Sequence, residues 1–216
     1  MFASFIAPLA AAFAGAWAAF KLQESHEDRK ERQTRESAIK RGIFVLTQQW
    51  NHLCTIQRKL NQFRDDPLRY LNLPPLRANK LDEIRINIES LDFILGTEHS
   101  QELMELSLDQ SHYDQTVMAI AIRADFMTDD LFPAFEKASV KFLQAGDGDV
   151  ELNMSDRVLR MAKSYTDNMY EHVDTTTERL NGAIRKLFRV GKELYPDAKF
   201  ILPVASDDER SFDSYP

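Results

Sequence analysis

The first twenty residues of the chain contain no charged side chain, whereas Lys21 begins a stretch that is dense in charge. An α-helix rises about 1.5 Å per residue, so the run from Met1 to Phe20 reaches roughly 30 Å, the thickness of a bilayer's hydrocarbon core. The charged stretch from Lys21 to Arg41 cannot enter lipid. The sequence therefore predicts a single N-terminal transmembrane anchor, with the rest of the chain on one side of the membrane.

Bulky and small residues separate onto different faces of this predicted helix. The bulky face supplies most of the membrane affinity, because alanine contributes little to insertion. We assign it to Phe5, Leu9, Phe13 and Trp17. Small residues spaced four apart let two helix backbones approach closely in lipid. We assign this helix-packing face to Ala7, Ala11, Gly15 and Ala19, and it predicts self-association. The alternative is that alanine is simply common in the run.

The flanking residues predict which way the anchor points. A cleaved signal peptide is one alternative, since Ala16, Trp17 and Ala18 form an A-x-A-like site, but no Lys or Arg precedes the run. The basic residues follow it, and the positive-inside rule then places the N-terminus outside and the body in the cytoplasm. The single cysteine, Cys54, agrees, because a secreted domain of this size could well carry disulfides. An exported body, cleaved or anchored, stays open as the alternative.

Beyond the anchor, apolar residues recur at helical spacing in several long segments. The expected helices run from about Arg35 to Phe63, from Asn79 to Leu95, from Ser100 to a kink near Pro133, and from Ser155 to Tyr195. No segment shows a convincing strand period of two. The predicted fold is all-α: an N-terminal transmembrane helix, then an antiparallel bundle of about four long amphipathic helices with heptad-like, coiled-coil stripes.

Composition shifts and proline positions predict the organisation of the chain. We expect an anchor at 1–20, a charged juxtamembrane helical linker at 21–38, a bundle domain at 39–196 and an acidic flexible tail at 197–216. The anchor helix is expected to continue into the first bundle helix without a break. The connector 68–76 is unusually apolar and is expected to pack back on the bundle. Gln57 and Gln110 interrupt otherwise apolar stripes.

The sequence contains no convincing catalytic, metal-binding or nucleotide-binding motif. Di-iron bundles need two Glu-x-x-His motifs, and the nearest approximation is a single Asp109-x-x-His112. Asp147 and Asp149 begin a calcium-like alternation, but Leu152 and Val158 replace the glycine and glutamate of an EF-hand. Phosphate-loop, dinucleotide and nucleophile-elbow motifs are absent. The sequence therefore predicts no catalytic, cofactor-binding or metal residues and no cofactor, and it makes Cys54 a small apolar filler.

Charge is distributed unevenly along the body. The net charge of −7 argues against a general nucleic-acid binder. Acidic residues dominate 98–136, whereas the end of the last helix is basic. Arg185, Arg189 and Lys192 share one side there and form a possible docking surface for anionic lipid headgroups. The simpler alternative is that the acidic and basic helices neutralise each other within the bundle.

These patterns favour a non-enzymatic, single-pass membrane protein. Its cytoplasmic helical bundle would bind other proteins or itself, as a scaffold, sensor or regulator. The expected partners are membrane lipids and a second copy or another protein, and not nucleic acid. Two alternatives stay open: an exported, envelope-spanning or membrane-remodelling helical protein, and an enzyme with a metal site in the bundle core.

Overall fold

A computed structural model describes residues 3–76, 84–137 and 155–203, with side chains from residue 15 onward. The elements in these ranges are all helical, which confirms the all-α class. The long helices are α1 (Ala3–Asn61), α3 (Ser100–Phe126) and α5 (Asp156–Leu194). The short ones are α2 (Arg69–Asn72), the 3₁₀ helix η2 (Glu89–Gly96) and the π-helix η3 (Met127–Leu131). Over these ranges the bundle thus contains three long helices rather than the predicted four.

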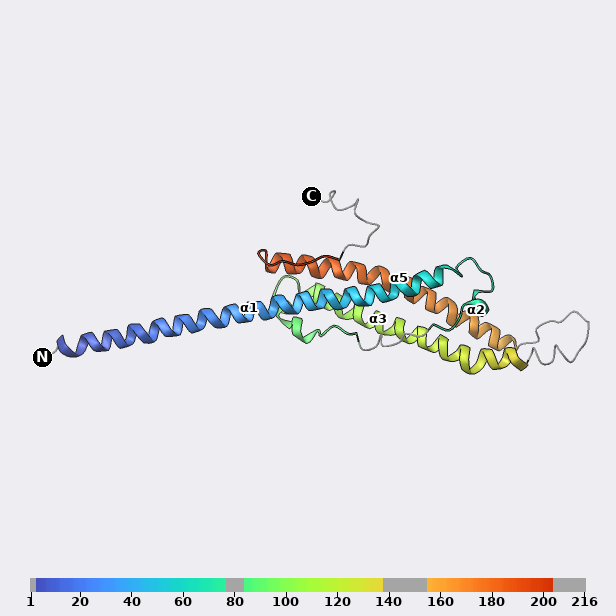
Figure 1. Ribbon diagram of the computed structural model, residues 1–216, viewed down its shortest axis with the longest axis horizontal. Coiled ribbons are helices and arrows are strands. Elements are labelled where there is room, and N and C mark those ends of the chain that lie inside the picture. The colour runs from blue at the N-terminus through green and yellow to red at the C-terminus, as the bar shows by residue number, and fades with distance from the viewer. Residues whose placement is uncertain (1–2, 77–83, 138–154, 204–216) are drawn as a thin grey trace, which may run out of the picture.

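Helix α5 packs along both of the other long helices, and the three run side by side in the bundle (Figure 1). It runs antiparallel to α1 and α3, which point in the same direction as each other. Helix η2 contacts both α1 and α3. The main core cluster therefore draws on α1, η2, α3 and α5, and it includes the fully buried side chains of Leu46, Leu53, Leu91 and Leu180. The amphipathic stripes predicted for the first, third and last helices supply this core.

Helix α1 is a single unbroken helix of 59 residues, as predicted for an anchor helix that continues into the bundle. Its residues 15–35, which we call the stalk, are all exposed and project beyond the other helices (Figure 1). Ion pairs one turn apart support the helical form of this charged segment, including Lys21 with Glu24 at 2.6 Å and Arg35 with Glu31. The stalk is helical because of its own side chains, since the bundle does not cover it.

Within the described residues, no helix combines the length and the hydropathy that crossing a bilayer requires. The predicted transmembrane helix therefore stays a prediction. Its bulky residues Phe5, Leu9 and Phe13, and its small residues Ala7 and Ala11, lie outside the residues whose side chains are described. The three assigned residues that are described, Trp17, Gly15 and Ala19, are exposed.

The helix predicted from Asn79 to Leu95 is wrong over the part that is described. Residues 84–87 form no helix, and the helix that follows is the 3₁₀ helix η2. The reason lies in two glutamines. Gln49 Nε2 donates to Ile84 O at 2.7 Å, and Ile86 N donates to Gln110 Oε1 at 3.2 Å. These side chains satisfy backbone groups of this segment that a helix would have paired internally.

The connector 68–76 packs on the bundle as predicted. Leu73 is fully buried and Leu76 nearly so, in a cluster with Ile120 and Val173. At the other end of α3, the expected kink near Pro133 is the π-helix η3, which ends two residues earlier. Proline lacks an N–H and clashes with the carbonyl four residues back, and a widened π turn accommodates both effects.

The segment after α5 folds back along the bundle. Ala198 and Phe200, at the start of the predicted tail, are buried. A Cβ atom at Gly191 would lie 3.0 Å from both Ile39 Cγ2 and the Phe200 ring, so α1, α5 and this segment meet where no side chain intervenes. The acidic remainder, 204–216, lies outside the described residues, as does the calcium-like turn at 147–153.

Candidate functional site at the base of the stalk

The stalk joins the bundle through aromatic side chains. The guanidinium of Arg32 lies 5.7 Å from the centre of the Tyr195 ring, and that of Arg35 lies 5.4 Å from the Phe93 ring. Burial raises the pKa of the Tyr195 hydroxyl, and the charge of Arg35 opposes this shift. Tyr195 directly follows α5 and Phe93 belongs to η2. The base of the stalk therefore contacts η2, which ends two residues before Glu98, and the end of α5, which carries Glu193.

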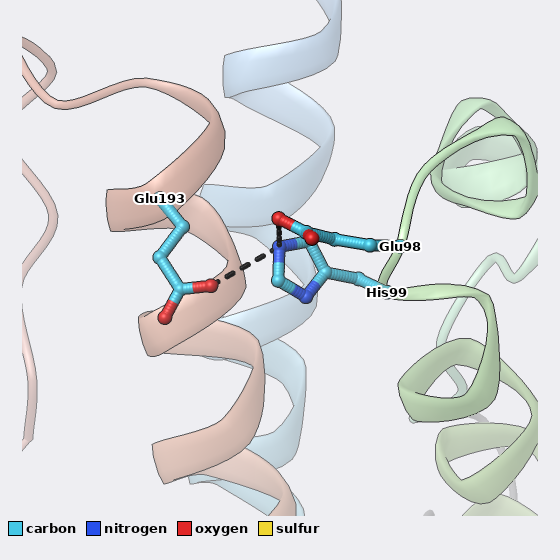
Figure 2. A group of neighbouring side chains, drawn as sticks. All are labelled: Glu98, His99 and Glu193. Atoms are coloured by element: carbon cyan, nitrogen blue, oxygen red, sulfur yellow. Dashed lines mark ion pairs between the residues drawn. The ribbon is translucent and has the colours of Figure 1, made fainter.

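That group is centred on His99, which is 6% exposed. Its Nε2 atom lies 3.1 Å from Glu193 Oε2 and 3.9 Å from Glu98 Oε1 (Figure 2). On the other side of the ring, Nδ1 lies 3.6 Å from Glu102 Oε1. One imidazole is thus surrounded by three carboxylates, two of them facing the same ring nitrogen. We call Glu98, His99, Glu102 and Glu193 the His99 cluster.

Local sequence explains why these side chains meet. Helix η2 ends at Gly96, and Thr97 Oγ1 then accepts a hydrogen bond from His99 N at 3.1 Å. This turn places His99 immediately before Ser100, the first residue of α3. Glu193 occupies the last turn of α5, which runs antiparallel to α3 and so ends where α3 begins. The cluster is a consequence of two antiparallel helices that start and end at the same level.

The cluster can hold a positive charge in two ways. A protonated His99 would pair with the carboxylates, whereas a neutral imidazole would leave Nε2 free to bind a cation together with Glu98 and Glu193. In the described part of the chain, these three residues form the one group of His, Cys, Asp and Glu side chains whose ligand atoms all lie within 4.8 Å of one another. No sequence motif indicates this group.

The acidic and basic helices pair with each other, as the simpler alternative predicted. Lys186 Nζ of α5 lies 2.5 Å from Glu105 Oε2 of α3, and its hydrogen bond is the largest cause of the lowered pKa of Glu105. Arg179 Nη2 lies 2.8 Å from Asp109 Oδ1, which accounts for the buried Asp109. Asp109 of the Asp109-x-x-His112 motif is therefore held by Arg179 of α5.

The predicted basic docking surface is only partly open. Arg189 and Lys192 are exposed, whereas Arg185 is half-buried. Lys192 Nζ donates to Ala198 O at 3.1 Å, so this ammonium helps to hold the segment after α5. Binding of lipid headgroups by this surface stays a prediction.

Gln57 and Gln110, the polar residues within the otherwise apolar stripes, form hydrogen bonds between helices. Gln57 Nε2 donates to Asp174 Oδ1 at 2.9 Å, which links α1 to α5. Gln110 Oε1 accepts from Gln49 Nε2 at 2.9 Å, which links α3 to α1. These glutamines therefore serve as interhelical hydrogen-bonding partners rather than as a lining for a ligand.

Arg123 is a fully buried cation that no sequence pattern indicates. Arg123 Nη2 donates to Leu73 O at 2.7 Å, Nη1 to Pro74 O at 3.2 Å, and Nε to Thr166 Oγ1 at 2.9 Å. These acceptors are two backbone carbonyls and a hydroxyl rather than a carboxylate. Burial therefore lowers the pKa of Arg123 to about 10, and the side chain is still protonated at neutral pH. Arg123 fixes the apolar connector to α3 and α5.

Cys54 is expected to react slowly. Burial raises the pKa of its thiol, and the nearby charge of Arg58 opposes this only in part. Because the thiolate is the nucleophile, we expect iodoacetamide at pH 8 to alkylate Cys54 in the folded protein more slowly than in the urea-unfolded chain. Mass spectrometry of timed samples measures both rates. A faster reaction in the folded protein would instead indicate an activated thiol.

No family model matches the chain, and neither a curated protein nor a solved structure shows significant similarity to it.

Proposed function

We propose that the protein is a membrane-anchored, non-enzymatic scaffold whose helical bundle binds other proteins or a second copy of itself in the cytoplasm. The observation that carries this proposal is the continuity of α1, which runs unbroken from the uncharged N-terminal segment into the bundle core. From Lys21, where the uncharged run ends, to Arg35 such a helix rises about 21 Å. An anchored bundle would therefore stand at a fixed distance from the membrane surface.

The sequence on either side of Lys21 supports the anchor and its orientation. The uncharged run before Lys21 is long enough to span a bilayer, and the Lys and Arg residues that follow favour the cytoplasmic side. Trp17 and Phe20 are exposed, although aromatic side chains of this size are favourable in contact with lipid. The small residues Ala7, Ala11, Gly15 and Ala19 would let two such anchors pack together.

An exposed apolar face on α3 supports a role in binding proteins. Its members are Met104, Leu108, Met118 and Ile122, all exposed. At 100° per residue these positions fall within an arc of about 80°, so they share one side of the helix. Grouped exposed apolar side chains are typical of surfaces that bind other proteins. This face points away from α5, which α3 contacts with its buried residues.

Lipid binding provides the first test. We expect the full chain to float with vesicles in a density gradient and a variant with Leu9, Phe13 and Trp17 all replaced by serine to stay in the aqueous fractions. The three replaced side chains would be buried in lipid. Their loss removes about 5 kcal/mol or more of transfer free energy from water to the bilayer, on the order of a thousandfold in partitioning. Phe44→Ser is the matched control, because Phe44 is exposed on the bundle.

A wild-type chain that stays in the aqueous fractions, or a triple variant that floats equally well, would contradict the anchor. Orientation needs a separate measurement on intact cells stripped of their wall. We expect a C-terminal tag to resist external protease there. Digestion of the tag in intact cells would place the bundle outside and overturn the cytoplasmic assignment.

A further inference from the structure

We propose that Glu98, His99 and Glu193 bind a divalent transition-metal ion of the zinc class at the base of the stalk. The three ligand atoms lie within 4.8 Å of one another, with Nε2–O separations of 3.1 Å to Glu193 and 3.9 Å to Glu98. Two ligands of a tetrahedral zinc ion, each about 2.0–2.1 Å from the metal, lie about 3.3 Å apart. The observed separations lie on either side of this value, so small side-chain rotations bring the atoms into range.

Glu102 provides an independent reason to read His99 as a ligand. Its Oε1 atom lies 3.6 Å from Nδ1, the ring nitrogen that faces away from the other two carboxylates. Metal-bound histidines usually donate their second N–H to a carboxylate, which fixes the tautomer and makes the ligating nitrogen more basic. With a proton on Nδ1, the lone pair would lie on Nε2, the atom that faces Glu98 and Glu193 (Figure 2). A small rotation of the Glu102 side chain would close the 3.6 Å separation to a hydrogen bond, and Glu102 is then a positioning residue for the proposed site.

The exposure and the charge of the three ligands are consistent with a metal ion that enters the site from solvent. The side chain of His99 is 8% exposed, which holds its ring in place, whereas those of Glu98 and Glu193 are 86% and 48% exposed. An ion can therefore enter between the two carboxylates and keep a water molecule as its fourth ligand. A neutral imidazole surrounded by three carboxylates leaves a net negative charge that a divalent cation offsets.

The ligand set selects the class of metal. An imidazole nitrogen with two carboxylate oxygens suits Zn²⁺ and its neighbours in the first transition row, whereas Mg²⁺ and Ca²⁺ prefer oxygen ligands alone. The ligands come from the turn before α3 and the last turn of α5, two residues before Tyr195, which contacts Arg32 of the stalk. A bound ion would tie these elements together and stiffen the junction through which the stalk meets the bundle.

Calorimetric titration of the chelator-treated full chain with ZnCl₂ tests the proposal. We expect one ion per chain with a dissociation constant below about 10 µM. Glu193→Gln should weaken binding by at least about tenfold and His99→Gln by about a hundredfold, because each removes a ligand. Glu102→Gln should weaken binding by about tenfold through the orientation of the ring. His112→Gln, a half-buried histidine outside the cluster, is the matched control.

Co²⁺ provides a second measurement, which reports ligation of the metal itself and would not change if His99 had only a structural role. Its visible absorption bands should appear on addition to the wild type and be absent in His99→Gln. Glu193 is half-exposed, so Glu193→Gln is expected to fold even where a His99 variant does not. Absence of zinc binding in the wild type would overturn the proposal. Equal affinity in the wild type and Glu193→Gln, or equal loss in His112→Gln, would overturn it as well.

Discussion

Replacing Arg123 with methionine is expected to lower the free energy of unfolding by about 3 kcal/mol, although methionine fills most of the same volume. Two buried acceptors, Leu73 O and Thr166 Oγ1, and the more accessible carbonyl of Pro74 would lose the donor that satisfies them. Removal of a desolvated charge offsets part of this cost, as the lowered pKa of Arg123 implies. Because the acceptors are mainly backbone carbonyls, no rearrangement of side chains can compensate for the loss.

Urea unfolding followed by circular dichroism measures the change, and the midpoint of thermal unfolding should fall by roughly 6–12 °C. Arg123→Lys should be intermediate, because one ammonium cannot reach all three acceptors. The matched control is Arg160→Met on α5, where the arginine is exposed and the expected change is within about 0.5 kcal/mol. Similar losses at both positions would show that Arg123 does not have the special role assigned to it.

The burial and the hydrogen-bond partners of Arg123 could not be predicted from the sequence. A lone base in an acidic segment gives no sign that it is buried, and its acceptors lie 49 and 50 residues away in a proline-containing connector. The apolar residues of that connector correctly predicted that it packs on the bundle. They could not predict that a guanidinium holds it there, because backbone carbonyls leave no trace in the sequence.

The helix predicted over residues 84–87 is a different kind of error, because the sequence also carries a competing pattern there. Ile84, Ile86 and Ile88 alternate with polar residues, and the burial follows this period of two. Ile84 and Ile88 also fit a helical spacing through Leu91 and Leu95, which is the pattern that predicts a helix. Leu95 is in fact exposed, and Ile94 is buried in its place. Hydrogen bonds from Gln49 and to Gln110 decide the outcome, and side-chain partners on distant helices cannot be recognised in a local stretch of sequence.

The His99 cluster was missed because its members are separated in the sequence. Motif rules for helical metal sites require an acid and a histidine on one helix, and Glu193 lies on another. What would have indicated the cluster is the antiparallel arrangement of the third and last predicted helices. The start of one helix then meets the end of the other (Figure 1), and His99 Nε2 lies 3.1 Å from Glu193 Oε2.

The last expected result concerns which face of α1 enters the core. Leu53→Ala is expected to lower the free energy of unfolding by about 3 kcal/mol, since Leu53 is completely buried and truncation leaves a cavity. Phe44→Ala, on the same helix, should cost less than about 1 kcal/mol, because Phe44 is 61% exposed even though it is the larger side chain. Urea unfolding of both variants beside the wild type measures the difference.

The comparison tests the architecture more sharply than either variant alone. Both residues are apolar and nine positions apart, so composition and hydropathy alone predict similar costs or a larger one for Phe44. The bundle predicts the opposite order, because α5 and η2 cover only the face of α1 that carries Leu46 and Leu53. A larger loss for Phe44→Ala would mean that α1 presents a different face to the bundle, and the stalk would then meet the His99 cluster from another side.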